Sequence, residues 1–302
     1  SNNFDNNVIS FSNIKGITLK DLHLRHNSQY NSSNVTDCDS VLFTNCILDQ
    51  FQLYFNSSTG VSLKNNHFKN NFGSRAVYFR DNADNNEQLS INITNNVIGD
   101  TTSDNPGAVR IYKNYSNSFK VLIDNNIFAQ GGRIDVDLER NLTGTTFTDT
   151  SIVSNNSYIF NSSSSAYYLS SNEFSQDDYS VFKNNDFQGI GMEFDYCDSI
   201  ISNRFVNIHT TSEYGIKLRR EGYFANNYID VSSSGSNDLY GLYIQQNNSP
   251  ITVAHNSINH TAFAGSAMYV EEDMSAGLKV KNNILYTSGG GIPLKAVTQS
   301  NV

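Results

Sequence analysis

The chain has 302 residues, of which 38% are hydrophobic and 16% are charged, and its formal net charge is −9 at pH 7. This acidic balance lacks the basic footprint of nucleic-acid binders, and no apolar run approaches the ~20 residues of a membrane-spanning helix. Low charge with abundant Asn, Ser, Thr and Tyr is typical of a β-solenoid with a polar surface.

A pair of asparagines followed by an apolar residue recurs along the chain, at spacings of about 18 to 30 residues that are typical of stacked repeats. The clear copies begin at Asn65, Asn95, Asn125, Asn155, Asn184, Asn226 and Asn282, and degenerate copies begin at Asn45, Ser202 and His255. Because Asn tolerates a left-handed backbone, we expect a tight bend at each pair. Inward-pointing amides would then bond to the coils above and below as a ladder.

Two exceptions to the pair have simple interpretations. Cys46 takes the ladder position in one early coil, where we expect a small buried hydrophobe. His255 takes the first place of a later pair, where we expect a structural substitute for Asn.

A second motif follows each pair after roughly a dozen residues and alternates apolar with variable residues, which is the period of a half-buried strand. Its copies are 76–79, 108–111, 134–138, 191–194, 215–218, 241–244 and 267–270. The stretches before the pairs, such as 61–63 and 121–123, alternate too. The sequence therefore predicts an all-β solenoid of about ten coils with three short strands per coil, in which stacking forms one continuous core.

This pattern resembles the right-handed parallel β-helix of the pectin-lyase-like superfamily, over nearly the whole chain from about Ile14 to Leu294. The resemblance implies a single solenoid domain over residues 1–302 and a secreted or cell-surface location. The superfamily includes lyases, hydrolases, epimerases, phage tailspikes and surface proteins, so the fold implies no single activity. Coil-like sequence at both ends without convincing caps predicts a piece of a larger secreted bacterial surface protein.

In the resembled superfamily, ligands usually lie along the strand that matches the second motif, and alternation gives this strand two outward rows. The first row is Tyr78, Arg110, Asp135, Tyr168, Glu193, Lys217, Tyr243 and Tyr269, and the second is Arg80, Tyr112, Asp137, Ser170, Asp195, Arg219, Gln245 and Glu271. Neighbours in a row should lie about 4.8 Å apart. Acids gather in the middle coils with basic residues beside them, as a sugar-binding groove would require.

The expected roles divide by chemistry. A hydrolase needs two carboxyls ~5 to 9.5 Å apart, which Asp135 could form with Asp137 or with Glu193. A uronate lyase would instead use Lys217 and Arg219 as base and neutralising cation. The candidate catalytic residues are Asp135, Asp137, Glu193, Asp195, Lys217 and Arg219, and the candidate substrate-binding residues are Tyr78, Arg110, Tyr112, Tyr168, Tyr243 and Tyr269.

Three alternatives stay open for these rows: ordinary charge pairing between strands, a calcium site at Asp135, Asp137 and Asp195, or catalysis. The compact motifs of polygalacturonases and pectate lyases are absent from the sequence. No cofactor other than calcium is implied. The pairing of Cys38 with Cys46 also stays open, and the six histidines are interpreted as surface or turn residues.

The leading expectation is an extracellular domain that engages polysaccharide along the outward rows, with carbohydrate processing left open. The expected partners are a glycan and flanking domains of the same large protein, with no nucleic acid and no membrane span. The rival expectation is a structural or adhesive stalk, for which the outward rows have no ligand. Side-by-side packing into a trimer, as in tailspikes, is a further open alternative.

Overall fold

The computed structural model describes the chain over 9–25, 32–69, 76–80, 88–99, 108–112, 118–129, 133–137, 150–159, 179–189, 191–195, 197–209, 213–219, 222–233, 238–245, 250–271 and 277–297. These residues form two compact units, the first reaching Ile159 and the second running from Ser180 onward. Regular structure in the described ranges consists of β-strands, and no helix among them could cross a membrane.

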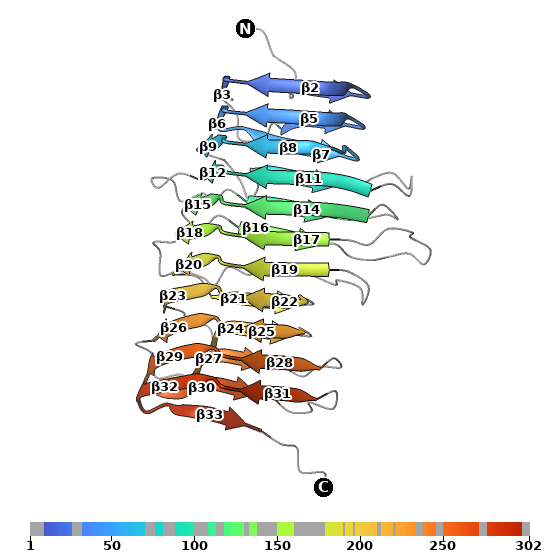
Figure 1. The fold of residues 1–302 in the computed structure, drawn as a ribbon. Helices are drawn as coiled ribbons and strands as arrows, with labels where there is room; N and C mark the ends of the chain where they lie inside the picture. Colours follow the sequence, from blue (N-terminus) through green and yellow to red (C-terminus); the bar gives the residue numbers. More distant parts are fainter. Residues whose placement is uncertain are drawn as a thin grey trace. The chain divides into compact units, whose positions relative to one another are not determined.

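The first unit is a stack of parallel strands in three sheets, and each coil contributes one strand to each sheet (Figure 1). The pre-Asn sheet precedes the asparagine pairs and contains β2 (Lys15–Lys20), β5 (Asp39–Thr44), β8 (Val61–Lys64), β11 (Gln88–Thr94), β14 (Ser118–Asp124) and β17 (Thr150–Ser154). The post-Asn sheet follows the pairs and contains β3 (His23–Arg25), β6 (Ile47–Asp49), β9 (His67–Lys69), β12 (Val97–Ile98), β15 (Ile127–Ala129) and β18 (Ser157–Ile159). The third sheet contains β1 (Ser10–Ser12), β4 (Ser32–Thr36), β7 (Gln52–Asn56), β10 (Val77–Arg80), β13 (Ala108–Tyr112) and β16 (Arg133–Asp137).

The second unit repeats this arrangement. Its pre-Asn strands are β19 (Tyr179–Lys183), which enters the unit at Ser180, β22 (Ser199–Ile201), β25 (Tyr223–Ala225), β28 (Ile251–Ala254) and β31 (Leu278–Lys281). Its post-Asn strands are β20 (Asp186–Gln188), β23 (Arg204–His209), β26 (Tyr228–Ser232), β29 (Ser257–Ala262) and β32 (Ile284–Gly289). Its third sheet contains β21 (Met192–Asp195), β24 (Tyr214–Arg219), β27 (Asp238–Ile244), β30 (Ala264–Val270) and β33 (Ile292–Ala296).

Both units are therefore parallel β-solenoids, which confirms the predicted fold class. The total number of coils, the handedness of the winding and the single-domain expectation stay predictions, because several connecting segments lie outside the described residues and the units are separate clusters.

In-register stacking builds the core of each unit. The rings of Phe55 and Phe79 lie 4.6 Å apart and nearly parallel in the first unit, and those of Phe187 and Phe205 lie 4.8 Å apart in the second. Parallel strands about 4.8 Å apart place equivalent side chains at this separation, so identical inward positions pack ring on ring. Burial of these large apolar side chains is the main favourable term for the fold.

The two members of each asparagine pair have different roles. The first member adopts a left-handed backbone, with φ of 55° at Asn65 and 57° at Asn95, and makes the bend between the pre-Asn and post-Asn strands. The second member points inward and is buried, as at Asn66 and Asn96. His255 has φ of 57° in a first position, so its interpretation as a structural substitute is confirmed.

The buried members form the expected amide ladder. In the first unit the Nδ2 of Asn66 donates to Oδ1 of Asn96 over 3.1 Å, and in the second unit the Nδ2 of Asn203 donates to Oδ1 of Asn227 over 3.1 Å. Cys46 occupies the ladder position as predicted and is 1% exposed. Its backbone N–H donates to Oδ1 of Asn66 over 2.9 Å.

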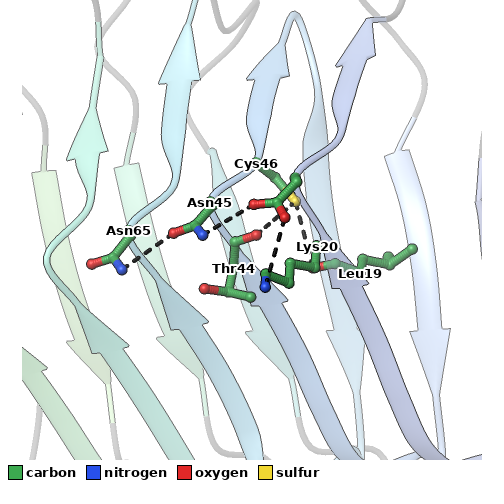
Figure 2. A network of polar contacts seen from close by, with 7 residues as sticks. Leu19, Lys20, Thr44, Asn45, Cys46 and Asn65 are labelled. Atoms are coloured by element: carbon green, nitrogen blue, oxygen red, sulfur yellow. Dashed lines mark hydrogen bonds and ion pairs between the residues drawn. The ribbon is translucent and has the colours of Figure 1, made fainter.

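A second, solvent-exposed chain of amides is formed by the first members of the asparagine pairs. The sequence analysis predicted only the inner ladder. Figure 2 shows Asn65 donating through Nδ2 to Oδ1 of Asn45 over 3.3 Å, with Cys46 beside them. Asn45 in turn donates to the carboxylate of Asp21 over 3.0 Å. The left-handed corner is thus bonded along the stack on both its inner and its outer side.

The structure corrects the expectation for His260 and answers the question of Cys38–Cys46 pairing. His260 was interpreted as a surface or turn residue, but it lies in β29 and is 0% exposed, because its inward parity on the strand places it in the core. Cys38, Cys46 and Cys197 are buried free thiols, so the structure contains no Cys38–Cys46 disulfide.

Candidate functional site

The strand register aligns the predicted outward rows within each unit. In the first unit, Tyr78 pairs with Arg110, which pairs with Asp135. Asp135 and Asp137 are placed by their backbone alone, and Tyr168 lies outside the described residues. Their proposed catalytic and binding roles stay predictions.

A cluster of aromatic and arginine side chains covers the outward face of the first unit's third sheet. The Tyr54 and Tyr78 rings meet edge to face at 5.0 Å, and Tyr78 is only 9% exposed. The guanidinium carbon of Arg110 lies 6.0 Å from the Tyr78 ring centroid and 5.5 Å from that of Tyr112. A hydrogen bond to the Tyr54 hydroxyl raises the pKa of Arg80. Tyr78, Arg110 and Tyr112 therefore meet in one cluster, as their rows predicted.

The second unit holds the more elaborate site, here called the tyrosine site: Tyr214, Tyr240, Tyr243 and Tyr269 with the polar residues that contact them. Tyr243 and Tyr269 are neighbours in the first row, and their rings stack at 5.1 Å with an interplanar angle of 21°. Tyr240 stacks on Tyr269 at 4.3 Å, and Tyr214 lies 5.8 Å from Tyr243. The four rings form one continuous aromatic group across β24, β27 and β30.

Two lysines bracket the stacked pair. The Lys217 Nζ lies 5.6 Å from the Tyr243 ring centroid and 5.1 Å from that of Tyr214. The Lys295 Nζ lies 5.6 Å from the Tyr269 centroid. Because an aromatic face attracts a cation, each lysine is held at one side of the stack.

One carboxylate serves two cations at the edge of the tyrosine site. Glu193 Oε1 lies 2.8 Å from Arg219 Nη1 and 3.7 Å from Lys217 Nζ. Arg219 Nε also donates to Oε1 of Gln245 over 2.5 Å. Lys217 is 8% exposed, and burial lowers its pKa although Glu193 opposes that change. Lys217 and Arg219 thus both contact Glu193, and these are three of the predicted catalytic residues.

Carboxylates also face the tyrosine hydroxyls. Burial raises the pKa of Tyr240 to about 12, and its hydroxyl donates to Asp238 Oδ2 over 3.3 Å. Burial and the Glu271 carboxylate raise the pKa of Tyr243. The Oε2 atom of Glu271 is buried and has no hydrogen-bond partner among the described residues.

Sequence reasoning missed Tyr214 and Tyr240. Counting alternately from Lys217 and Tyr243 assigns both to the inward face, yet their rings join the outward rings. Each is followed by a glycine, Gly215 or Gly241, in a column where an added Cβ would meet the next strand's carbonyl oxygen at 3.2 or 2.7 Å. A tyrosine–glycine dipeptide repeated at the same register, Tyr214 paired with Tyr240, was the available signal.

Asp195, the remaining predicted acid of the second unit, pairs with Arg219 in register and is placed by its backbone alone. Asp135 and Glu193 belong to different units, so their pairing stays a prediction. Across the ranges that the structure describes, no group of three His, Cys, Asp or Glu side chains is arranged to hold a metal ion.

Comparison with known proteins gave no match to any protein-family model, curated protein or solved structure.

Proposed function

We propose that the chain binds polysaccharide on the outward face of its third sheet, and that the tyrosine site of the second unit is the main contact. The observation that carries the proposal is the convergence of four tyrosines with Glu193, Lys217 and Arg219 on four consecutive strands of one sheet, β21, β24, β27 and β30. Tyrosines that offer apolar area and a polar tip beside fixed charged groups suit the mixed surface of a sugar.

The orientation of the rings indicates how a glycan would be held. Tyr243 and Tyr269 stack along the solenoid axis, so their faces contact each other and the lysines rather than solvent. Their hydroxyl oxygens carry lone pairs that can accept hydrogen bonds from a ligand. An extended chain would therefore make repeated hydrogen bonds along the row, at the strand spacing of about 4.8 Å, rather than rest on a flat aromatic platform.

The site contains one group with the chemistry for processing a bound glycan. Lys217 is buried and its pKa is lowered, which is the direction required of a lysine base. Glu193 is held in ion pairs by Lys217 and Arg219. Proton abstraction by a lysine base acts on the acidic C–H beside a uronate carboxylate, so the proposal is restricted to binding and includes no processing step.

A secreted or cell-surface location and a place among the pectin-lyase-like β-helices are parts of the same proposal. They are supported by the asparagine repeat and by the low charge of a chain rich in polar residues.

A structural stalk is the second candidate, and one observation favours it. Charges on adjacent strands neutralise each other in the second unit, as Arg219 does with Glu193 and as Arg204 does with Asp186 at 2.9 Å. Cross-strand pairs of this kind stabilise a stack without any ligand.

The test is a glycan-array and turnover screen on the whole chain, with and without calcium, using wild type and a Tyr243→Ala variant. Tyr228→Ala is the matched control, because Tyr228 is 42% exposed on β26 of a different sheet. Binding that Tyr243→Ala abolishes and Tyr228→Ala retains supports the proposal. The absence of binding to every glycan, or equal loss in both variants, rejects the tyrosine site and favours the stalk.

A further inference from the structure

The hydrogen-bonding state of the tyrosine site restricts the chemical class of its ligand, and this inference rests on the proposed function. Two positive groups of the site, Arg219 and Lys217, already have polar partners, and the third, Lys295, contacts the Tyr269 ring. Arg219 is held by Glu193 and Gln245, and Lys217 lies between Glu193 and two tyrosine rings. An anionic ligand would have to compete with these contacts.

One acceptor atom of the site is less well satisfied, on a carboxylate that also raises the pKa of Tyr243 through a hydrogen bond. Glu271 Oε2 is buried without a hydrogen-bond partner in the described part of the chain, although the residue as a whole is only half-buried. Leaving such an acceptor unpaired is unfavourable, and a ligand that donates a hydrogen bond to it would remove that penalty.

The tyrosine hydroxyls reinforce this polarity. The Tyr240 hydroxyl donates a hydrogen bond to Asp238, and the Tyr214 hydroxyl donates one to Glu193 Oε2 over 3.4 Å. A hydroxyl that donates to a carboxylate still has lone pairs to offer a ligand. The raised pKa values of Tyr240 and Tyr243 keep both hydroxyls protonated at neutral pH.

We propose that the ligand is an uncharged polysaccharide, and that Glu271 determines this specificity by accepting hydrogen bonds from sugar hydroxyls beside Tyr243. A polyuronate or a sulfated glycan would bring its anionic groups towards the Glu271 carboxylate, and like charges in a half-buried site repel. The chain's net charge of −9 opposes the approach of a polyanion in the same direction.

The experiment compares a charged glycan with a neutral form of the same backbone, polygalacturonate against its methyl ester, in physiological salt without divalent cations. A polymer of glucosamine serves as a cationic arm. We expect the methyl ester to bind wild type at least about tenfold more tightly than polygalacturonate, the size of one hydrogen bond to a charged acceptor. Tighter binding of either charged polymer than of every neutral glycan in a wider neutral panel overturns the inference and leaves polysaccharide binding intact.

The residue is tested with Glu271→Gln, which keeps the side-chain volume and replaces one acceptor oxygen with a donor. We expect about tenfold weaker binding of the neutral glycan and less discrimination against polygalacturonate. Asp186→Asn, at an exposed ion pair on β20, is the control and should leave binding unchanged. Unchanged affinity in Glu271→Gln overturns the role of Glu271.

Two further results separate the inference from the proposed function. If no glycan of either class binds, the proposed function fails and the inference fails with it. If Glu271→Gln does not fold, as judged by its thermal unfolding, the neutral-against-charged comparison on wild type still decides the ligand class.

Discussion

Asn96 donates twice to a single atom of Asn126: its backbone N–H and its side-chain Nδ2 each lie 2.9 Å from Oδ1 of that residue. The amide of Asn126 donates in turn to the carbonyl oxygen of Ile93 over 2.9 Å. A buried amide would otherwise be unfavourable, so the asparagine column is stable only as a stack in which each coil satisfies the last.

The inner and outer asparagines should therefore differ sharply when they are replaced. Asn126→Ala removes the acceptor of the buried Asn96 backbone N–H and the side-chain donor to the Ile93 carbonyl, whereas Asn96 Nδ2 keeps its bond to the Leu63 carbonyl, and we expect a loss of about 3 kcal/mol in the free energy of unfolding. Asn125→Gly removes an exposed amide and tolerates the φ of 54°, so we expect a loss below about 1 kcal/mol. Urea unfolding of both variants checks this, and equal losses would contradict the two-role description.

Two glycines with similar backbone angles allow contact to be separated from conformation. Gly265 has φ of +102°, and an added Cβ would lie 1.9 Å from the Leu239 carbonyl oxygen, whereas Gly277 has φ of +94° with nothing within 4 Å. We expect Gly277→Ala to lose about 1–2 kcal/mol from strain alone. Gly265→Ala should lose about 3 kcal/mol or more, because strand β27 must move as well. Thermal unfolding that ranks them the other way would show that the close approach is not rigid.

Acid should weaken the second unit through His260. Its Nε2 lies 2.8 Å from the Leu239 carbonyl oxygen, which fits an N–H donor there, and its Nδ1 is buried without a hydrogen-bond partner in the described residues. Burial lowers the pKa of His260, so below the usual value of about 6.5 the unfolded chain takes up a proton that the folded chain does not. Stability at this residue is thus full above that pH and falls as the pH drops towards the folded pKa.

The neighbours of His260 that the structure describes in register and against its ring are uncharged. In register, Val231 of β26 and Thr287 of β32 flank it, and Gly291 packs close to the ring. The measurement is the melting temperature from pH 7 to pH 5 in wild type and His260→Gln. We expect the variant to lose less on acidification, and parallel curves would contradict the assignment to this histidine.

Because Glu193 pairs with two cations, we expect replacing it to destabilise the fold more than replacing one of the cations. Glu193→Gln leaves Lys217 and Arg219 close together without their anion, and we expect a loss of about 1–2 kcal/mol at pH 7. Lys217→Met keeps the buried stem and removes a poorly solvated charge, so its change should stay within about 1 kcal/mol. Urea unfolding of the two single variants measures this, and a larger loss in Lys217→Met than in Glu193→Gln would show that the lysine is the stabilising partner.

The fold was readable from the sequence because one physical requirement repeats along it. A left-handed residue followed by a buried amide recurs from coil to coil, as at Asn65 and Asn66, and Cys46 replaces the buried amide in one early coil. The outward rows were readable for a related reason. Alternation counted within each copy of the second motif places Glu193, Lys217, Tyr243 and Tyr269 in one row wherever pairing is parallel and in register.

The tyrosine site was only partly readable, because strict alternation fails at the glycine column. Tyr240 and Tyr243 are three residues apart, an odd separation that assigns them to opposite faces, yet their rings lie 5.6 Å apart. His260 fails in a different way, since a polar residue on a regular strand was given to the surface when its parity pointed inward. Strand alternation thus predicts the buried position of His260 correctly, and it predicts the wrong face for the Tyr240 ring.

The ladder also has a consequence for how such a chain can diverge. Successive ladder partners are 18 residues apart between Asn185 and Asn203 but 30 apart between Asn66 and Asn96, while the bond lengths hardly differ. The asparagine corner resets the strand register in each coil. A gain or loss of residues elsewhere in a coil therefore does not shift the register of the next coil. Insertions at the other corners can therefore accumulate independently in each coil, and they can change the surface without changing the packing of the core.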